Sequence, residues 1–217
     1  MPNTIPEVVI LRLPLYARVL GELRERGQQV VSSQTLGRLL HATPAQIRKD
    51  LSYFGRFGKQ GRGYSVDYLL RELRQIMGLE HEWPVILIGV GLLGKALLSY
   101  GGFAPQGFHI VAAFDADPAL IGTRVGDLMV QPPSELESVV RAKRPQVAIV
   151  AVPTHACQAV IDQVVKAGIK GILNYAPYQA QTPDGVWVRD IDPVVALQSM
   201  TYYLKPPETK SAEAAAG

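Results

Sequence analysis

The stretch Gly89-Val-Gly91-Leu-Leu-Gly94 constrains the fold of this 217-residue chain most, because it directly follows the apolar run of residues 84–88. A buried strand that enters a G-x-G-x-x-G turn and then a helix is typical of a dinucleotide-binding Rossmann unit. The first glycine allows a sharp turn, the second lets the backbone approach a pyrophosphate at the helix N-terminus, and the third allows close helix-strand packing. The sequence therefore predicts a nucleotide site here, and a Gly-rich turn without a ligand is the alternative.

A second apolar run, residues 109–114, ends in Asp115. An acidic side chain at the end of this strand accepts hydrogen bonds from an adenosine ribose and repels a 2′-phosphate, which favours NAD(H) over NADP(H). Asp115 follows Gly89 by 26 residues, which exceeds the usual spacing of about 20. The Gly-rich connector of residues 101–107 accounts for the excess.

The chain changes character near residue 80. Before it, the pattern is helical with one Gly-rich turn, and after it apolar strands alternate with helices, which predicts an α/β domain with a parallel sheet. Further strands are expected at residues 125–130, 147–152 and 169–173, and a capping box at Ser134 is expected to open a helix. The predicted organisation is residues 1–80, 81–191, a last helix at 192–204, and a disordered tail at 205–217.

Charge is distributed unevenly between the halves. Residues 1–80 hold 12 Lys and Arg against 7 Asp and Glu, net +5, whereas residues 81–217 hold 10 against 12, net −2. This asymmetry suggests a polyanionic partner for the first half alone. The single cysteine, Cys157, and the absence of a leader or a long apolar run favour a cytoplasmic protein without membrane contact. The four histidines lack metal-ligand spacing, so no metal is expected.

Three helices are predicted before residue 55. The first spans residues 7–26, and Pro14 is expected to kink or restart it; Ser32 or Ser33 caps the second. The third begins with a capping box at Thr43-Pro-Ala-Gln46 and runs to residue 54. Ile47, Leu51 and Phe54 share its inward face, and the outward side chains are long donors suited to base edges and phosphates: Gln46, Arg48, Lys49, Ser52 and Tyr53.

A short turn joins the second and third helices, which predicts helix-turn-helix geometry. The basic segment Gly58-Lys59-Gln-Gly-Arg62-Gly then fits a β-hairpin wing, in which Lys59 or Arg62 reaches a phosphate or the minor groove. A basic helix is most often only a solvated face, but the order of helix-turn-helix and wing within a basic domain favours DNA binding.

These residues resemble the Rex-type redox-sensing transcriptional repressors. The resemblance runs from about residue 5 to residue 204 and rests on specific strings, listed here in chain order: Gln46-Ile-Arg-Lys-Asp-Leu-Ser-Tyr-Phe-Gly55, Gly61-x-Gly-Tyr64, Gly89-Val-Gly-Leu-Leu-Gly94, Phe114-Asp-Ala-Asp-Pro118, Val152-Pro153 and Gly168-Ile-Lys-Gly-Ile-Leu-Asn-Tyr-Ala-Pro177.

The resemblance implies a homodimer with an N-terminal winged helix, a Rossmann domain and a last helix exchanged between subunits. It implies binding to double-stranded operator DNA with TTGTGAA-type half-sites when the protein is free or holds NAD⁺, and release when NADH binds. It also implies a switch in which Asp192 changes partners between Tyr100 and Arg18. The implied cofactor-binding residues are Gly89, Val90, Gly91, Leu92, Leu93, Gly94, Asp115, Val152 and Pro153.

Three positions depart from the family pattern. Gln60 stands in the wing where many members have arginine, and Arg62 follows two residues later, so the minor-groove contact is expected to have moved. Leu92 replaces an arginine near the phosphates, and Pro193 stands where some members place an aromatic near the nicotinamide.

Two other functions fit parts of the pattern. An NAD-dependent dehydrogenase would need an acid-base group near the nicotinamide, and His155 is the histidine placed for that role. Because the first 80 residues look like a DNA reader, no second domain remains to form a substrate cleft, and no catalytic residue is expected. A regulator that binds CoA or another adenine nucleotide is the other alternative, in which Asp115 would matter less.

Overall fold

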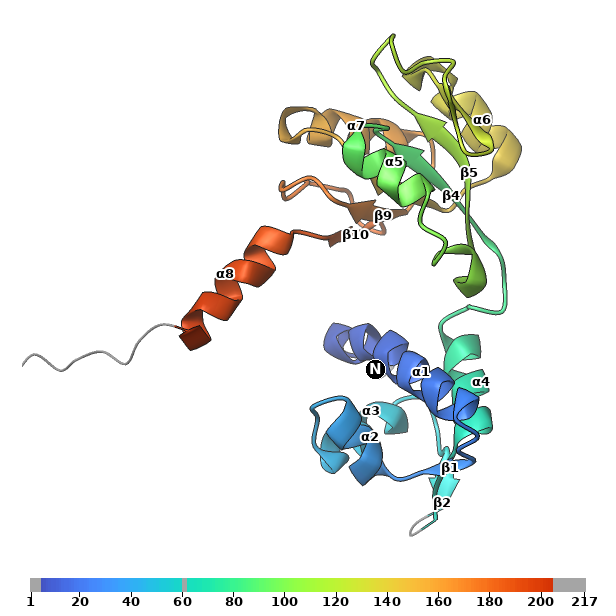
Figure 1. Ribbon diagram of the computed structural model, residues 1–217, viewed down its shortest axis with the longest axis vertical. Coiled ribbons are helices and arrows are strands. Elements are labelled where there is room, and N and C mark those ends of the chain that lie inside the picture. Colours follow the sequence, from blue (N-terminus) through green and yellow to red (C-terminus); the bar gives the residue numbers. More distant parts are fainter. Residues whose placement is uncertain (1–4, 60–61, 205–217) are drawn as a thin grey trace, which may run out of the picture. The chain divides into compact units, whose positions relative to one another are not determined.

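The computed structural model describes residues 5–59 and 62–204, and the chain divides into two compact units, Met1–Glu82 and Trp83–Gly217 (Figure 1). Gln60 of the predicted wing and the predicted tail at 205–217 lie outside the described residues. Within the described part, no helix combines the length and the apolar character needed to cross a membrane.

The first unit is a winged helix. Its three short strands form an antiparallel sheet in the order β1-β3-β2. The three helices predicted before residue 55 and the wing hairpin of β2 and β3 are confirmed. The elements of this unit are α1 Glu7–Glu25, β1 Val30–Val31, α2 Ser33–Leu39, α3 Pro44–Ser52, β2 Gly58–Lys59, β3 Gly63–Ser65 and α4 Val66–Ile76. Apolar side chains from all four helices form its core, among them Leu20, Leu36, Ile47 and Leu69.

Helix α1 runs through Pro14 as one continuous helix, so the expected restart was wrong. Proline removes the hydrogen bond from its own nitrogen to the carbonyl four residues earlier, here that of Ile10. Pro14 and Ile10 are both exposed. Water can therefore hydrate the unpaired carbonyl, while Leu13 and Tyr16 keep the inner face of α1 in the core.

The turn between α2 and α3 depends on a glycine that the sequence analysis did not single out. Gly37 is buried in α2, and a β-carbon there would overlap the carbonyl oxygen of Ala42. The amide of Ala42 donates to the carbonyl of Gly37 at 2.8 Å. The absence of a side chain at Gly37 therefore lets the turn fold back onto α2 and set the start of α3.

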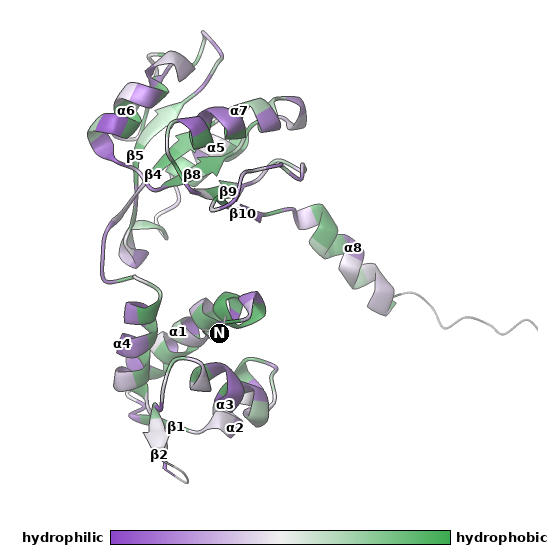
Figure 2. Ribbon diagram, turned by 180° about the vertical axis from the view of Figure 1, so that it is seen from behind, coloured by the Kyte–Doolittle hydropathy of each residue, from purple (hydrophilic) through white to green (hydrophobic). Residues whose placement is uncertain are grey.

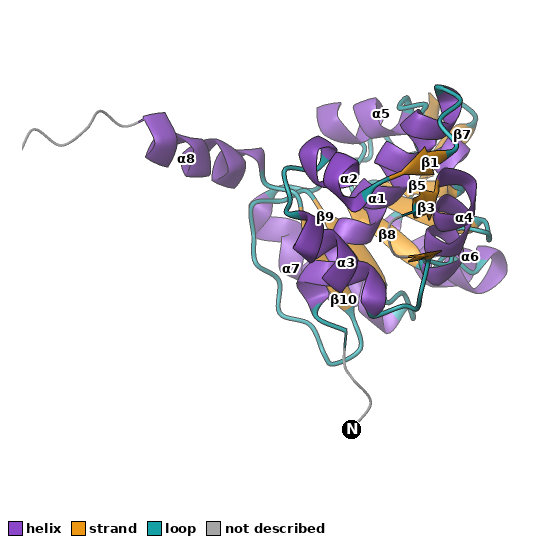
Figure 3. Cartoon of the chain, turned by 90° about the horizontal axis from the view of Figure 1, so that it is seen from below, coloured by secondary structure: helices purple, strands orange, loops and turns teal. Residues whose placement is uncertain are grey.

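The second unit is a Rossmann domain (Figures 1 and 3). Its seven-stranded sheet has the order β10-β9-β8-β4-β5-β7-β6, and every neighbouring pair is parallel except β6 and β7. The strands are β4 Trp83–Ile88, β5 Phe108–Phe114, β6 Arg124–Val125, β7 Leu128–Gln131, β8 Val147–Val150, β9 Gly171–Asn174 and β10 Trp187–Asp190. Without β6, this is the 3-2-1-4-5-6 order of dinucleotide-binding domains, in which the direction of winding reverses between the first and fourth strands.

Helices cover both faces of this sheet. Side chains of α6 Leu136–Lys143 and α7 Thr154–Lys166 pack on one face, and those of α5 Leu92–Leu98 pack on the other. The central strands carry mostly hydrophobic residues, as the colouring of Figure 2 shows. Single-turn 3-10 helices lie at Ala104–Gln106 and Pro133–Glu135, and α8 spans Pro193–Leu204.

Two predicted elements of this unit are present, but the extent of one and the cap of the other were wrong. Residues 125–130 form no single strand, because Gly126, with φ +59°, turns the chain into the β6-β7 hairpin. Ser134 caps no helix through its side chain, since it lies inside the 3-10 turn Pro133–Glu135 that leads into α6. In both cases a tight local turn moves the start of the predicted element, which follows the turn as β7 or as α6.

We expect Gly37→Ala to lower the free energy of unfolding of the first unit by about 1–3 kcal/mol, because its methyl group would overlap the Ala42 backbone. Gly21→Ala is the matched control, since a β-carbon at this position of α1 would meet no described atom within 4 Å. It should stabilise the helix by up to about 1 kcal/mol. Urea unfolding followed by circular dichroism measures both, and equal effects would contradict the close-contact explanation.

Candidate nucleotide pocket and DNA-facing helix

A cavity of about 670 Å³ lies at the carboxyl ends of the central strands of the second unit. Its wall includes Gly89 after β4, Asp115 after β5, Val152 after β8 and Tyr175 after β9. The volume is in the range of small-molecule sites, and the position is the reversal point where open α/β sheets bind ligands. The predicted nucleotide turn therefore lines a cavity of suitable size.

The three glycines of the turn differ in whether the surrounding protein requires a residue without a side chain. Gly89 has φ +95°, and a β-carbon there would lie 2.7 Å from the carbonyl carbon of Ala151. A β-carbon on Gly94 would overlap the carbonyl oxygen of Gly89. By contrast, one on Gly91 would meet no described atom within 4 Å, although Gly91 lines the cavity. The protein itself does not require glycine at 91, so the open space is available to a ligand.

Asp115 has a role within the protein that the sequence analysis missed. Its Oδ2 accepts a hydrogen bond from the backbone amide of Val90 at 2.6 Å, and its Oδ1 accepts one from the amide of Asp117 at 2.8 Å. The carboxylate thereby joins the end of β5 to the glycine turn. A carboxylate has about four acceptor positions, so two remain for hydroxyl groups of a ligand.

The other predicted cofactor residues divide into two groups. Leu92, Leu93, Val152 and Pro153 line the cavity, and Leu92 is 93% exposed. Val90 and Gly94 are buried and are not part of the cavity wall. Their contribution is to the shape of the turn.

Two potentially reactive side chains lie close together in sequence on α7. His155 is exposed and lines the cavity, whereas Cys157 is fully buried and burial raises the pKa of its thiol. A buried thiol with a raised pKa is a poor nucleophile. Among the described residues, no cluster of three or more His, Cys, Asp or Glu side chains is arranged to hold a metal ion.

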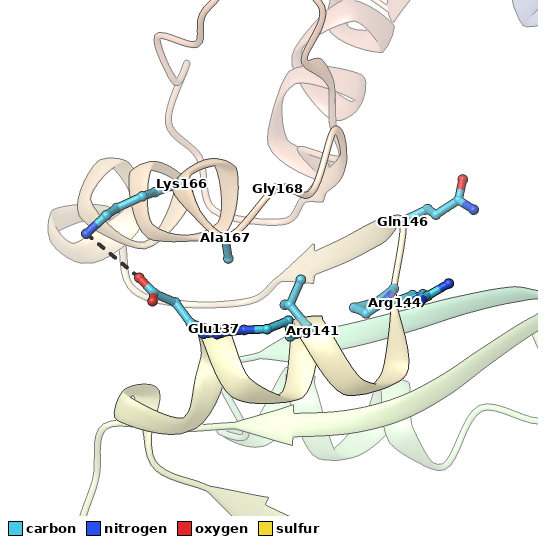
Figure 4. Close-up of a pocket in the computed structure, with 9 residues that line it drawn as sticks. Glu137, Arg141, Arg144, Gln146, Lys166, Ala167 and Gly168 are labelled. Carbon is cyan, nitrogen blue, oxygen red and sulfur yellow. Dashed lines mark ion pairs between the residues drawn. The ribbon is translucent and has the colours of Figure 1, made fainter.

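A second cavity, of about 610 Å³, lies at the amino ends of the strands, where α6 and α7 finish (Figure 4). Arg141, Arg144 and Lys166 line it, and Lys166 pairs with Glu137 at 3.8 Å. All four side chains are exposed. None of the predicted site residues belongs to this cavity.

In the first unit, α3 has the predicted inward face and one unexpected member. Ile47 and Leu51 are buried, and so is the charged Asp50. Arg12 donates to the two Asp50 oxygens at 2.6 and 2.8 Å, Gln46 donates to Oδ1 at 2.5 Å, and the Tyr16 hydroxyl donates to Oδ2. Burial alone would raise the pKa of Asp50, but these hydrogen bonds outweigh it and hold the pKa below its ordinary value.

The buried ion pair affects the charge that α3 presents. Because Arg12 on α1 neutralises Asp50, the acidic residue of the Arg48-Lys49-Asp50 string does not cancel the cations beside it. Arg48 and Lys49 are exposed, although Arg48 also donates to the Ser33 hydroxyl at 3.1 Å. The outward face of α3 is therefore positive, as a DNA-facing helix requires.

The remaining polar residues of α3 are partly occupied within the protein. Thr43 caps the helix by accepting from the Gln46 amide, but the Gln46 side chain turns to Asp50 and does not complete the predicted capping box. Ser52 is exposed and donates to the carbonyl of Lys49 at 2.7 Å, and Tyr53, half-buried, follows the last helical residue.

The wing is built on a tight glycine contact. Gly63 has φ +72°, and a β-carbon there would lie 2.6 Å from the carbonyl oxygen of Val31, so glycine lets β3 approach β1. Arg62, the turn residue before β3, is exposed. Lys59 ends β2, and the placement of its side chain lies outside the described part of the chain.

The three predicted switch residues have separate local surroundings. Arg18 is exposed on α1, and Tyr100 is exposed and packs edge-on against Phe103 at 5.1 Å. Asp192 accepts hydrogen bonds from the amides of Val194 at 2.8 Å and Val195 at 3.4 Å, so it caps the N-terminus of α8. The switch itself stays a prediction.

Comparisons with known families agree with this division. Residues 4–52 match the family described as Putative DNA-binding protein N-terminus, and residues 80–178 match the CoA binding domain family. Proteins named Redox-sensing transcriptional repressor Rex match almost the whole chain. The one from Chloroflexus aurantiacus is 56% identical over 199 residues, which cover 92% of this chain and 94% of the relative. The one from Roseiflexus sp. is 53% identical, covering 92% and 90%.

Solved structures extend the similarity to the fold. The structure of RSP in complex with β-NAD⁺ and operator DNA is 35% identical, with a TM-score of 0.88, and covers 93% of both chains. RSP in complex with β-NADH is 33% identical, with a TM-score of 0.85, and covers 93% of this chain and 95% of that one. RSP is described as a Rex-family repressor.

We expect Gly94→Ala and Gly91→Ala to fail in different ways. Gly94→Ala should lower the free energy of unfolding of the second unit by about 1–3 kcal/mol, because its methyl group overlaps the Gly89 carbonyl. Gly91→Ala should leave stability near wild type but weaken NADH binding, because its methyl group enters the open space of the cavity. Thermal unfolding and calorimetric NADH titration measure the two effects. Unchanged NADH affinity in Gly91→Ala would show that no ligand approaches there.

The lowered pKa of Asp50 predicts acid sensitivity of the first unit. A carboxyl whose pKa is lower in the folded state stabilises the fold above its unfolded pKa of about 3.9 and loses that contribution as pH falls through the folded value. The free energy of unfolding should therefore decrease as the pH is lowered below about 4. In Asp50→Asn this part of the pH dependence should disappear, and an unchanged pH profile would assign it to other carboxylates.

Proposed function

Because this chain belongs to the Rex family of redox-sensing transcriptional repressors, we propose that it binds operator DNA and that NADH binding releases it. One observation carries the proposal: a single chain joins two units of suitable kind. The first is a winged helix whose reading helix, α3, presents a positive outward face, and the second is a Rossmann domain whose cavity is lined by Asp115, which follows β5. Its relatives of this name match both units together. Residues 1–80 are assigned to DNA, 81–191 to the nucleotide and 192–204 to dimerisation.

The proposed ligand of the cavity is NAD(H). RSP has been solved with β-NAD⁺ and with β-NADH. In this chain the open space at Gly91 would admit the pyrophosphate, and the unused acceptors of Asp115 would bind the adenosine ribose hydroxyls. Val152 and Pro153 would then lie along the cavity wall toward the nicotinamide. The bound dinucleotide supplies the redox signal, since its oxidised form carries a positive charge on the ring and its reduced form does not.

CoA or another adenine nucleotide is the second candidate, and the match to the CoA binding domain family favours it. CoA carries a phosphate on its ribose, as NADP(H) does, and the Asp115 carboxylate would repel it. The same carboxylate accepts from hydroxyl groups without such a cost. We therefore place CoA behind NAD(H), and a direct comparison of the two ligands decides between them.

The proposed DNA contacts are those of a winged helix. Arg48 and Lys49 would neutralise phosphates, with Gln46, Ser52 and Tyr53 nearer the base edges and Lys59, Gln60 and Arg62 on the wing. Binding through phosphates predicts that operator affinity falls with salt, with a log-log slope of about −0.9 for each neutralised phosphate.

Regulation requires a coupling free energy between the two units. If NADH lowers operator affinity 100-fold, the coupling is about 2.7 kcal/mol, and operator must weaken NADH binding by the same factor. Asp192, Tyr100 and Arg18 are the proposed switch residues. Since Asp192 caps α8 in the structure, a change of partner would cost the helix its cap.

We propose that the protein is a homodimer closed by α8. None of the twelve residues of Pro193–Leu204 is charged, and none is buried within the described chain. Its exposed apolar side chains include Val195, Leu197, Met200 and Tyr203. A helix of this composition is unfavourable in water, and a second copy of the chain is the proposed cover.

The chain is a regulator by family, and we propose that it catalyses no reaction. Its relatives are named as repressors. His155 lines the cavity and is the residue that would serve as the acid-base group of a dehydrogenase. In a regulator, His155 would contact the bound nucleotide without transferring a proton. We place the protein in the cytoplasm, where it meets both DNA and the NAD(H) pool.

Fluorescence-anisotropy binding to a labelled palindromic duplex with TTGTGAA-type half-sites tests the proposed function. NADH should release the duplex at concentrations where NAD⁺ and CoA have little effect. Asp115→Ala should still bind the duplex but need at least about tenfold more NADH for release, because a ribose contact is lost. Tight DNA binding that ignores NADH but responds to CoA would establish the second candidate.

Removal of residues 193–217 tests the dimer. The full-length chain should elute as a dimer in size-exclusion chromatography with light scattering, and the shortened chain should elute as a monomer with weaker binding to the palindromic duplex. The double substitution Leu197→Asp/Met200→Asp should act in the same direction without shortening the chain. A full-length monomer at micromolar concentration would contradict the proposed dimer.

A further inference from the structure

The Asp50 carboxylate is saturated with donors. It is 0% exposed, and it accepts from Arg12 twice, from the Tyr16 hydroxyl and from the Gln46 side chain. An ionised carboxylate has about four acceptor positions and no donor. Each of its positions is therefore taken by a named group, three of them from α1.

This arrangement fixes the orientation of the Gln46 amide. A carboxylate can only accept, so the nitrogen of the amide must face Asp50, and Nε2 does so at 2.5 Å. The carbonyl oxygen, Oε1, then lies at the other side of the amide. Among the described residues no group donates to it. One N–H of Nε2 also remains free, because an amide nitrogen has two.

Gln46 occupies a position that favours base contact. It is the third residue of α3, after Pro44 and Ala45, and it is only half-buried. In helix-turn-helix proteins the N-terminal residues of the reading helix contact base edges. Lys49, one turn later, is exposed and carries only donors, so it suits phosphates or guanine.

We propose that Asp50 is a positioning residue for sequence recognition, which holds the Gln46 amide so that α3 reads the major-groove edge of an adenine. This inference rests on the proposed DNA-binding function. The outward oxygen accepts from the amine of adenine or cytosine, and with the remaining N–H the amide matches the amine and N7 of adenine. Guanine presents two acceptors in the major groove and thymine one acceptor and a methyl group, so neither matches the oxygen.

Asp50 would therefore influence specificity although it touches no DNA. These hydrogen bonds also make the selection of the base depend on α1, since Arg12 and Tyr16 hold the Asp50 carboxylate that orients the Gln46 amide. Without these hydrogen bonds to Asp50 the amide can turn over, and its nitrogen can then donate to the acceptors of guanine as readily as its oxygen accepts from the amine of adenine.

Modified duplexes test this with the full-length protein. In the TTGTGAA-type duplex each adenine in turn is replaced by purine, which lacks the exocyclic amine, and anisotropy is measured at low salt for wild type, Gln46→Ala and Asp50→Asn. At one position per half-site wild type should lose about tenfold or more in affinity. Loss of the amine also weakens the base pair, and the loss of affinity measured for Gln46→Ala on the same duplexes gives the size of that effect alone.

Asp50→Asn should lose most of this discrimination, because asparagine both donates and accepts and leaves the amide free to turn. Lys49→Ala is the matched control on α3, and it should weaken binding to all duplexes by one common factor while keeping the discrimination. If Asp50→Asn unfolds because Arg12 loses its counterion, Arg12→Met/Asp50→Asn removes both charges and carries the same expectation.

The outcomes separate this inference from the proposed function. Wild-type discrimination retained by folded Asp50→Asn or by Gln46→Ala would overturn the inference alone. So would a wild type that releases DNA with NADH but shows no position sensitive to loss of the amine. Failure of wild type to bind any of the duplexes would overturn the proposed function, and this inference with it.

Discussion

The first unit depends on one buried carboxylate that joins two helices distant in sequence. Asp50 of α3 is held by Arg12 and Tyr16 of α1, so the reading helix cannot shift without disturbing α1. Removing one partner of such a pair leaves an uncompensated charge in the core and costs about 3–5 kcal/mol. The same pairing leaves Arg48 and Lys49 as the net charge on the outward face. Position, stability and charge of α3 thus follow from one set of hydrogen bonds.

A second carboxylate has the corresponding role in the Rossmann unit. Asp115 joins the end of β5 to the glycine turn through the amide of Val90, and so it shapes the cavity that it also lines. Each proposed site is thereby organised by an acidic side chain that accepts from its own chain. In the first unit, the Gln46 amide beside Asp50 is left for DNA. In the second unit, the remaining acceptor positions of the Asp115 oxygens are left for the nucleotide.

Much of this arrangement could be predicted from the sequence. Caps, apolar spacing and the glycine turn are local signals, and from them the helices of the first unit, the alternation of strands and helices in the second, and most of the cavity-lining residues of the glycine turn could be predicted. The misses have a common cause in contacts between distant residues or in tight turns. The burial of Asp50 was not predicted, because its partner Arg12 lies 38 residues earlier in the chain. Gly37 and Gly126 act through backbone approach and φ, which residue patterns describe poorly. The absence of charged residues in α8 can be read from the sequence, whereas its exposure within the described chain is known only from the structure.

The central claim is that the nucleotide cavity and the reading helix are energetically coupled, and the most direct test is the affinity of NADH with and without operator. Calorimetric titration of NADH into the free protein and into its complex with the palindromic duplex gives both values. The coupling predicts that the duplex weakens NADH binding by the same factor by which NADH weakens duplex binding. Equal NADH affinity in the two titrations would contradict the account, because two uncoupled units cannot form a redox-sensing repressor.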